Sequence, residues 1–184
     1  MHNIPPAQNI LIVDEHDNCI GEEDKERCHD GDGILHRGFL AMLFTDRGEL
    51  VLARRSARKR LWPGFWDGTV ASHVLRGEDY LLASRRRLIE ETGLVADSIR
   101  YLFKFRYKAG YRDAGTEHEI CAVTLVTDID EEQLLPDSSE IAELRTIDPR
   151  SIVIDRASEE YTPWLILALD HMRQQRQVWP VAAP

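Results

Sequence analysis

Two glutamates one residue apart, Glu117 and Glu119, open an alternating run of residues that is typical of a β-strand. Side chains at positions i and i+2 share one face of a strand, so both carboxylates and the Cys121 thiol are expected to point the same way. Two neighbouring carboxylates repel each other unless a cation or a shared proton lies between them. The pair therefore indicates a metal or acid/base site, and the alternative is the exposed edge of a surface strand.

Histidines flank a glycine-rich stretch at His29 and His36, seven residues apart. Imidazole is a common metal ligand, but these two side chains reach one ion only if the intervening loop folds back. A pair of surface histidines is the alternative. A third histidine, His73, lies in an expected strand at residues 67–74, where a histidine taken by itself is expected to be a buried core residue.

A cluster of cations follows an expected hairpin, although the chain is acidic overall with a net charge of −9. Arginine binds phosphate in a bidentate manner and lysine binds it as a point charge, so the cluster predicts a clamp for a diphosphate. A solvated basic loop is the alternative. The cluster consists of Arg54, Arg55, Arg58, Lys59 and Arg60.

These groups need rigid elements to position them, and the clearest is a helix that ends at Gly93, a residue type that commonly follows a helix. Side chains at helical spacing predict the face that packs on the core. That face consists of Leu81, Leu82, Arg85, Leu88 and Ile89.

The same helix predicts two ion pairs four residues apart, Arg86 with Glu90 and Arg87 with Glu91. Glu78 lies in the glycine turn before the helix, so several carboxylates can converge on one spot. Hard divalent cations such as Mg²⁺ need such oxygen ligands and in turn hold phosphate oxygens. A solvated helix face with surface ion pairs is the alternative.

Other segments show local patterns that predict further strands at residues 9–13, 19–21, 37–45, 49–54, 67–74, 98–107, 117–126 and 143–147. Residues 22–27 are expected to form one helical turn, and residues 108–116 a loop. Thr162 and Pro163 suit the start of a final amphipathic helix over residues 165–175.

The length of 184 residues predicts a single domain over residues 1–184, with a core at about 9–172 and loosely held tails at 1–8 and 177–184. The negative net charge makes nucleic acid an unexpected partner. Neither a signal peptide nor a membrane-spanning apolar run is found, so no membrane association is expected. Three cysteines suggest reduced thiols and the cytoplasm.

The stretch from Ser72 to Leu94 resembles the Nudix box. The matching positions are Ser72, Glu78, Arg86, Arg87, Leu88, Glu90, Glu91, Gly93 and Leu94. Two of them depart from the form seen in Nudix hydrolases: Ser72 replaces a glycine, and Arg87 replaces a glutamate that commonly helps to bind metal. An arginine there resembles the type 1 isopentenyl-diphosphate isomerases, a branch of the same superfamily.

The resemblance to these isomerases covers about residues 9–172 and implies an α/β fold, the Nudix-type α/β/α sandwich with a mixed sheet. It implies interconversion of isopentenyl and dimethylallyl diphosphate, a reaction of isoprenoid biosynthesis. One group adds a proton to an alkene carbon, and another removes a proton from a neighbouring carbon. The implied residues are Glu119, Tyr107 and Trp164 for catalysis, Arg55, Lys59 and Arg87 for the diphosphate, and His29, His36, His73, Glu117, Glu119 and Glu91 for metal.

The resemblance also implies divalent metals: Mg²⁺ with the diphosphate near Glu91, and Zn²⁺ or Mn²⁺ (or Mg²⁺) at the His/Glu site. The expected partner is a small-molecule diphosphate, and the expected assembly is a monomer or a weak homodimer.

One position departs from the isomerases in a way that bears on chemistry. The group that exchanges the second proton is a cysteine in that family, and the matching residue here is Ala71, whose methyl cannot exchange a proton. The loop Asp67-Gly68-Thr69 is also similar to those of isomerase-like Nudix hydrolases. We therefore expect an isomerase-type protein with impaired or altered activity. The alternatives are a Nudix diphosphohydrolase acting on a prenyl or related diphosphate, and a non-catalytic prenyl-diphosphate binder.

Overall fold

The structure is a computed structural model that describes residues 8–175. Apart from Gln8, the loosely held tails expected at residues 1–8 and 177–184 lie outside the described residues. The strands are β1 (Asn9–Val13), β2 (Cys19–Asp24), β3 (His36–Thr45), β4 (Leu50–Arg55), β5 (Trp66–Asp67), β6 (Val70–His73), β7 (Arg100–Tyr111), β8 (Gly115–Ile129) and β9 (Ile141–Ile147). The helices are α1 (Lys25–Cys28), α2 (Tyr80–Thr92) and α3 (Pro163–Gln174), with short 3₁₀ turns at Glu131–Gln133 and Pro149–Ser151.

Strand β3 is the centre of the sheet. It pairs in parallel with β8 and antiparallel with β1, β4 and β6. The long β7–β8 hairpin extends one side of the sheet, and β4 carries β5 and β9 on the other side. The sheet is therefore mixed, as the family resemblance implies.

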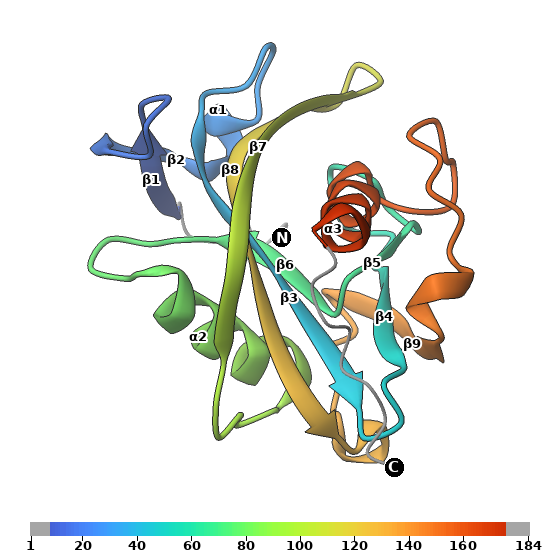
Figure 1. Cartoon of the computed structure of the whole chain (residues 1–184). Helices are drawn as coiled ribbons and strands as arrows, with labels where there is room; N and C mark the ends of the chain where they lie inside the picture. The colour runs from blue at the N-terminus through green and yellow to red at the C-terminus, as the bar shows by residue number, and fades with distance from the viewer. Residues whose placement is uncertain (1–7, 176–184) are drawn as a thin grey trace, which may run out of the picture.

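Helices α2 and α3 cover opposite faces of this sheet (Figure 1). Alternate residues of β3 point to the two faces, because successive side chains of a strand alternate. Leu40 and Met42 pack in a cluster with Leu165 of α3, whereas Ala41 packs in a second cluster with Leu88 of α2. This arrangement confirms the expected α/β/α sandwich.

The core-facing side of α2 differs from the predicted one. Leu81, Leu82 and Ile89 are 37%, 53% and 44% exposed, and of the predicted face only Leu88 is fully buried. The residues of α2 that are buried instead are Ala83, Ser84, Leu88, Glu91 and Thr92. Small residues allow the helix backbone to approach the sheet closely, and this rotation turns Glu91 inward. The helix ends as predicted, at Gly93 with a left-handed φ of 70°.

Three other predicted segments, a loop, a strand and a helical turn, also differ from the structure. Residues 108–116 form the tip of the β7–β8 hairpin and not a long loop, because β7 continues to Tyr111 and β8 begins at Gly115, with only the turn at 112–114 between them. The predicted strand at 67–74 is broken between β5 and β6, and the predicted helical turn at 22–27 begins only at Lys25. Hydrogen bonding to neighbouring strands decides these boundaries, and a local pattern does not contain it.

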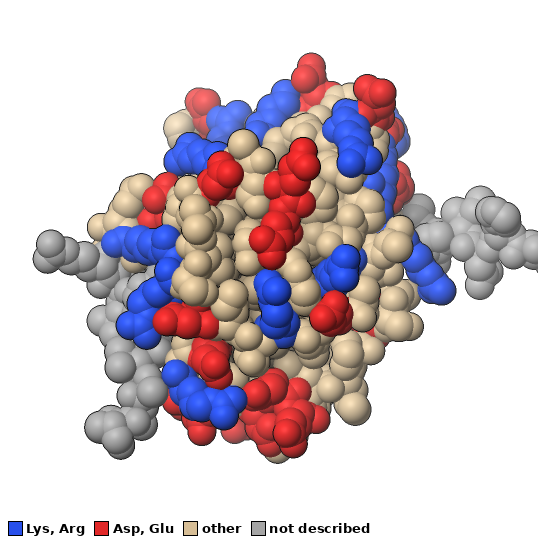
Figure 2. Space-filling view, turned by 90° about the vertical axis from the view of Figure 1, so that its right-hand side faces the viewer, with Lys and Arg blue, Asp and Glu red and all other residues tan. Residues whose placement is uncertain are grey.

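Among the described residues, no helix is long and apolar enough to cross a membrane. All three cysteines lie within the described range and are free thiols. On the face shown in Figure 2, Lys and Arg side chains are interspersed with Asp and Glu side chains. This face therefore carries both signs of charge side by side.

Candidate functional site

Strand register brings the predicted residues together. In the parallel β3–β8 pair His36 lies opposite Glu119, and in the antiparallel β7–β8 pair Tyr107 lies opposite the same glutamate. On the other side of β3, His73 of β6 is paired with Gly38. Four strands therefore direct these side chains to one place at the end of β3.

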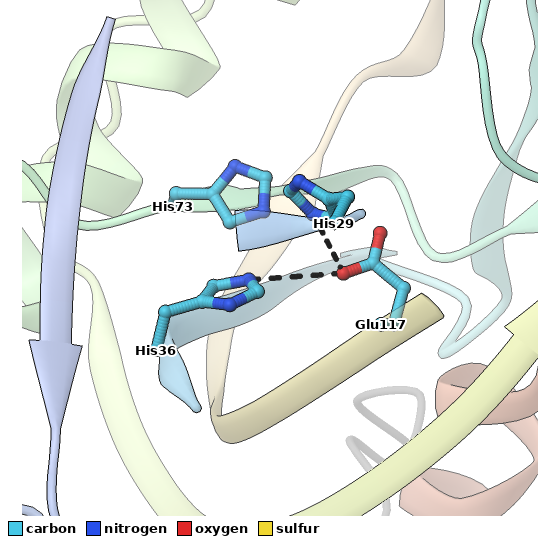
Figure 3. Close-up of side chains that lie close together, drawn as sticks. All are labelled: His29, His36, His73 and Glu117. Atoms are coloured by element: carbon cyan, nitrogen blue, oxygen red, sulfur yellow. Dashed lines mark hydrogen bonds and ion pairs between the residues drawn. The ribbon is translucent and has the colours of Figure 1, made fainter. Parts of the chain in front are cut away.

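Three histidines and one glutamate form a compact group: His29, His36, His73 and Glu117 (Figure 3). One ligand atom from each residue lies within 4.8 Å of the others. Nε2 of His29 is 2.9 Å from Oε2 of Glu117, and Nε2 of His36 is 3.7 Å from the same oxygen. The loop between the first two histidines thus folds back, as a shared metal ion requires.

The donor atoms of this group fit a divalent metal ion. Nδ1 of His29 lies 2.5 Å from the Lys25 carbonyl and Nδ1 of His36 lies 2.8 Å from the Ile34 carbonyl. An Nδ1–H that donates to a carbonyl leaves the Nε2 lone pair free for a metal. Nε2 of His36 is buried and has no hydrogen-bond partner among the described residues. Burial, together with His36 and His29, holds the pKa of His73 well below its ordinary value, which keeps this imidazole neutral.

Glu119 lies beside this group and also contacts Tyr107. Its Oε1 is 3.4 Å from Nε2 of both His36 and His73, and its Oε2 accepts a 2.7 Å hydrogen bond from the Tyr107 hydroxyl. Burial and the charge of Glu117 raise the pKa of Glu119, and burial and Glu119 raise that of Tyr107. This carboxyl group therefore holds a proton more tightly than an exposed glutamate does.

A cavity of about 290 Å³ runs from the His/Glu group to the basic loop. Two predicted residues do not line it: His36 is buried beneath, and Glu91 lines a smaller adjoining cavity. The predicted residues that line the main cavity are His29, Arg55, Lys59, His73, Arg87, Tyr107, Glu117, Glu119 and Trp164.

The three predicted diphosphate-binding cations are already paired. Arg55 donates to the Leu61 carbonyl and forms a 3.1 Å ion pair with Asp67. Arg87 donates to Glu91 at 2.5 Å and lies 3.2 Å from Glu140, which also contacts Lys59. The part of the cavity where an anionic ligand would bind therefore contains carboxylates of the protein as well as its cations.

Asp67 contacts both Arg55 and Trp164, a tryptophan that lines the main cavity. Its Oδ1 accepts hydrogen bonds from Nε1 of Trp164 at 2.7 Å and from the Thr162 hydroxyl at 2.9 Å, while its Oδ2 pairs with Arg55. The Arg55 guanidinium carbon lies 5.2 Å from the centre of the Trp164 ring. Asp67 therefore fixes both the ring plane and the guanidinium.

The carboxylates of α2 do not all converge as the sequence suggested. Glu78 accepts 2.6 and 3.0 Å hydrogen bonds from Arg86 and is absent from both cavity walls, and Glu90 is turned outward to Arg86 and Arg87. Only Glu91 points inward, because the buried face of α2 differs from the predicted one.

Sequence reasoning missed three charged residues that the fold brings to the site. Lys25 and Glu140 line the main cavity, and Asp67 lines the smaller one. Lys25 lies four residues before His29 on the α1 turn. Residues four apart are neighbours on a helical turn, so this spacing could have placed Lys25 beside His29 from the sequence alone. Glu140 precedes β9 in a polar segment and has no local feature that sets it apart.

Ala71 lies on the wall that separates the two cavities and lines both of them. The smaller cavity measures about 10 Å³, near the lower limit of the space that holds one water molecule. Asp67 and Glu91 also line it, so its walls offer polar partners for such a water.

Comparisons with known proteins identify the family of this chain. A NUDIX domain matches residues 34–167. The chain is 40% identical over 137 residues to an isopentenyl-diphosphate Delta-isomerase from Haloarcula marismortui, covering 73% of both chains. It is 34% identical over 170 residues to a protein of the same name from Leifsonia xyli subsp. xyli, covering 90% of this chain and 91% of that protein.

Solved structures share the fold at lower identity. The crystal structure of DR0079 from Deinococcus radiodurans matches with a TM-score of 0.71 and 22% identity, covering 89% of this chain and 98% of that chain. A MutT protein from Methanosarcina mazei Go1 matches with a TM-score of 0.61 and 16% identity, covering 78% and 96%. These likenesses concern the fold.

Proposed function

The chain belongs to the isopentenyl-diphosphate Delta-isomerase family of NUDIX-domain proteins, and from this premise we propose that it interconverts isopentenyl and dimethylallyl diphosphate. Its substrate would be a small-molecule diphosphate. The observation that carries the proposal is a single cavity with a buried proton-holding pair at one end and cations at the other. The Tyr107–Glu119 pair faces the cavity that Lys59 and Arg87 also line, as a substrate with a reacting alkene and a diphosphate requires.

The reaction adds a proton to the terminal alkene carbon and removes a different one from the neighbouring methylene carbon, so that atoms and charge balance. Glu119, which accepts a hydrogen bond from Tyr107 and lines the cavity beside the His/Glu group, is placed to deliver the first proton. Positive charge then develops on the tertiary carbon between these two positions. The π-face of Trp164, held by Asp67, can stabilise that charge.

Two divalent metals fit the proposal. His29, His36, His73 and Glu117 would hold Zn²⁺ or Mn²⁺ (or Mg²⁺), with Glu119 beside them. Such an ion supplies positive charge that makes a nearby acid a better proton donor. Glu91 would contribute to a Mg²⁺ site shared with the diphosphate, next to Arg87.

The second proton transfer needs an acid/base group, and the methyl side chain of Ala71 cannot serve as one. A proton next to a tertiary carbocation is strongly acidic, so a weak base suffices to remove it. A water molecule in the small cavity behind Ala71 is the candidate, since Asp67 and Glu91 line the same space. Loss of one general acid or base typically lowers a rate ~10² to 10⁴-fold, so we expect slow isomerisation.

A hydrolase is the second candidate, because Ala71 removes a group that isomerisation needs and leaves the rest of the cavity intact. It would use a divalent ion at Glu91 to activate water for attack on the diphosphate. Arg87 opposes this function, since it places a cation beside Glu91 where Nudix hydrolases commonly have a further carboxylate. A non-catalytic binder needs only the cations and the apolar wall. Cytoplasmic location and a monomer or weak homodimer remain predictions.

Nuclear magnetic resonance separates these functions in one experiment. The protein is incubated with isopentenyl diphosphate, Mg²⁺ and Zn²⁺ in deuterated water while proton and phosphorus signals are followed. Dimethylallyl signals with deuterium uptake and an intact diphosphate support the isomerase. Release of inorganic phosphate or a monophosphate would establish the hydrolase instead. Line broadening without reaction would indicate a binder, and sharp unchanged lines would contradict the proposed substrate class.

A further inference from the structure

One charged side chain of the cavity has no part in the chemistry described above. Glu140 lies just before β9 and lines both the main cavity and the smaller one. Its carboxylate contacts Lys59, from the loop after β4, and lies 3.2 Å from Arg87 of α2. These are two of the three cations predicted to bind the diphosphate, so Glu140 is the internal counter-ion of that cluster.

The two cations that contact Glu140 favour its negatively charged form. Burial acts to raise its pKa, but Lys59 and Arg87 outweigh burial and lower the pKa to about 2. The side chain is 25% exposed, so solvent screens this charge only in part. A diphosphate that enters the cavity therefore meets a carboxylate in the middle of its binding cations.

Glu91 places a second carboxylate at the same point. One nitrogen of Arg87, its Nη2, lies 2.5 Å from Oε1 of Glu91 and 3.2 Å from Oε1 of Glu140. The two carboxylate oxygens therefore both contact a single cationic atom. A divalent cation that arrives with the diphosphate would be attracted to the same pair of oxygens.

From this arrangement we infer that Glu140 is a specificity-determining residue, which makes the cavity take a diphosphate as its complex with a divalent cation and disfavours the free diphosphate. The inference rests on the proposed function, because it assumes that the cavity binds a diphosphate. A free diphosphate must break the contacts of Glu140 with Lys59 and Arg87 and then lie against an uncompensated negative charge. With a divalent cation bound, the same carboxylate faces positive charge and becomes attractive.

A purely structural role for Glu140 makes a different prediction. If the carboxylate only holds Lys59 and Arg87 in place, its loss weakens binding by the same factor with and without the metal. If it selects the metal complex, its loss strengthens binding of the free diphosphate in particular. The ratio of the dissociation constants measured without and with Mg²⁺, here called the magnesium factor, separates the two roles.

Isothermal titration calorimetry with inorganic diphosphate measures this ratio directly, because the probe cannot be isomerised. Full-length wild-type protein and Glu140→Gln are dialysed into the same buffer and titrated with and without Mg²⁺. We expect the wild type to bind far better with Mg²⁺. In Glu140→Gln the dissociation constant of the free diphosphate should fall about tenfold or more, and the magnesium factor should shrink by a similar ratio.

Two further variants control the test. Glu143→Gln removes the same charge from β9, where Glu143 pairs with Arg54 away from both cavities, and should keep the wild-type magnesium factor. Glu140→Ala removes the charge without adding an amide and should act like Glu140→Gln, which guards against a folding defect in one variant.

The outcomes separate the inference from the proposed function. An unchanged magnesium factor in both Glu140 variants, with the wild type binding diphosphate, overturns the inference and leaves the proposed function standing. If the wild type binds inorganic diphosphate neither with nor without Mg²⁺, the cavity is not a diphosphate site. That result would overturn both the inference and the proposed function.

Discussion

The carboxylate of Glu119 lies against Gly38 so closely that it fills the space a Cβ atom would occupy at that glycine. Both residues lie within the parallel β3–β8 pair, where Gly38 is opposite Cys121, two residues along from Glu119. Only a residue without a side chain leaves room there for the carboxylate. The position of the proton-holding pair therefore depends on a glycine that belongs to no motif of the sequence.

Gly38→Ala should displace the Glu119 carboxylate and abolish most of the activity. Overpacking of a buried site typically costs about 1–3 kcal/mol of stability, so the variant is expected to fold with a lowered melting temperature. Gly110→Ala is the matched control, since a Cβ there meets only Thr116 Oγ1 at 3.8 Å. Activity and thermal melts of both variants check the prediction, and full activity of Gly38→Ala would contradict it.

Glu119→Gln should lower isomerase activity by ~10² to 10⁴-fold, because an amide cannot deliver the proton. Tyr107→Phe removes the 2.7 Å hydrogen bond to Glu119 and should cause a smaller loss. Tyr101→Phe changes a half-exposed tyrosine of the same strand and serves as the control. Initial rates with isopentenyl diphosphate are measured for all three variants. Equal rates for Glu119→Gln and wild type would show that Glu119 does not deliver the proton.

Ala71→Cys should raise isomerase activity by about 10²-fold or more if the chain is an isomerase that lacks one proton-exchanging group. Ala71→Ser adds a hydroxyl of similar size but negligible acidity and should give little or no gain. The rates of both variants are compared by proton resonance of the dimethylallyl product. If the cysteine brings no gain, the assignment of the cavity wall at Ala71 to the second proton transfer is wrong.

His36→Ala should abolish tight metal binding at the His/Glu group. Loss of even an outer partner of a metal ligand costs ~10–100-fold in affinity, so loss of the ligand itself should exceed about 100-fold. Zinc content after dialysis, measured by atomic emission, and the rise of the melting temperature on zinc addition report the effect. His16→Ala, a change at a histidine with a 76% exposed side chain, should bind zinc like the wild type. Equal zinc content in both variants would exclude this group as the metal site.

Glu140 makes the stability of the fold depend on pH at the acid end. Burial acts to raise its pKa, but Lys59 and Arg87 outweigh it and lower the value from 4.5 to about 2 in the folded chain. The unfolded chain therefore takes up this proton first as pH falls. The stabilisation is fully present above about pH 4.5 and is lost as the pH falls from there toward 2.

Urea unfolding at a series of pH values measures this contribution. The difference in unfolding free energy between wild type and Glu140→Gln should be constant above pH 4.5 and should shrink between pH 4.5 and 2. Glu143→Gln, at an exposed position of β9, is the matched control for loss of one negative charge. A Glu140→Gln difference that stays constant down to the lowest pH would show that the ion pairs with Lys59 and Arg87 contribute nothing.

Local sequence patterns predicted most strands and the end of α2 at Gly93, because periodicity and turn residues act over a few neighbouring positions, whereas the sandwich fold was implied by the family resemblance. They also picked out residues that the fold brings together, since the i and i+2 spacing of Glu117 and Glu119 places both on one strand face. The roles of these residues in catalysis and binding remain predictions until the variants above are measured.

The tertiary structure alone decided which face of α2 is buried, how the cations are paired and why Glu119 fits. Lys59 and Glu140 are 81 residues apart in sequence, and Gly38 and Glu119 meet only because β3 and β8 pair in parallel. Such contacts depend on the register of distant strands and on close packing between layers, neither of which any short stretch of sequence records. The sequence by itself determined the inventory of chemical groups and the local elements, whereas the fold determined which charges face one another in the cavity.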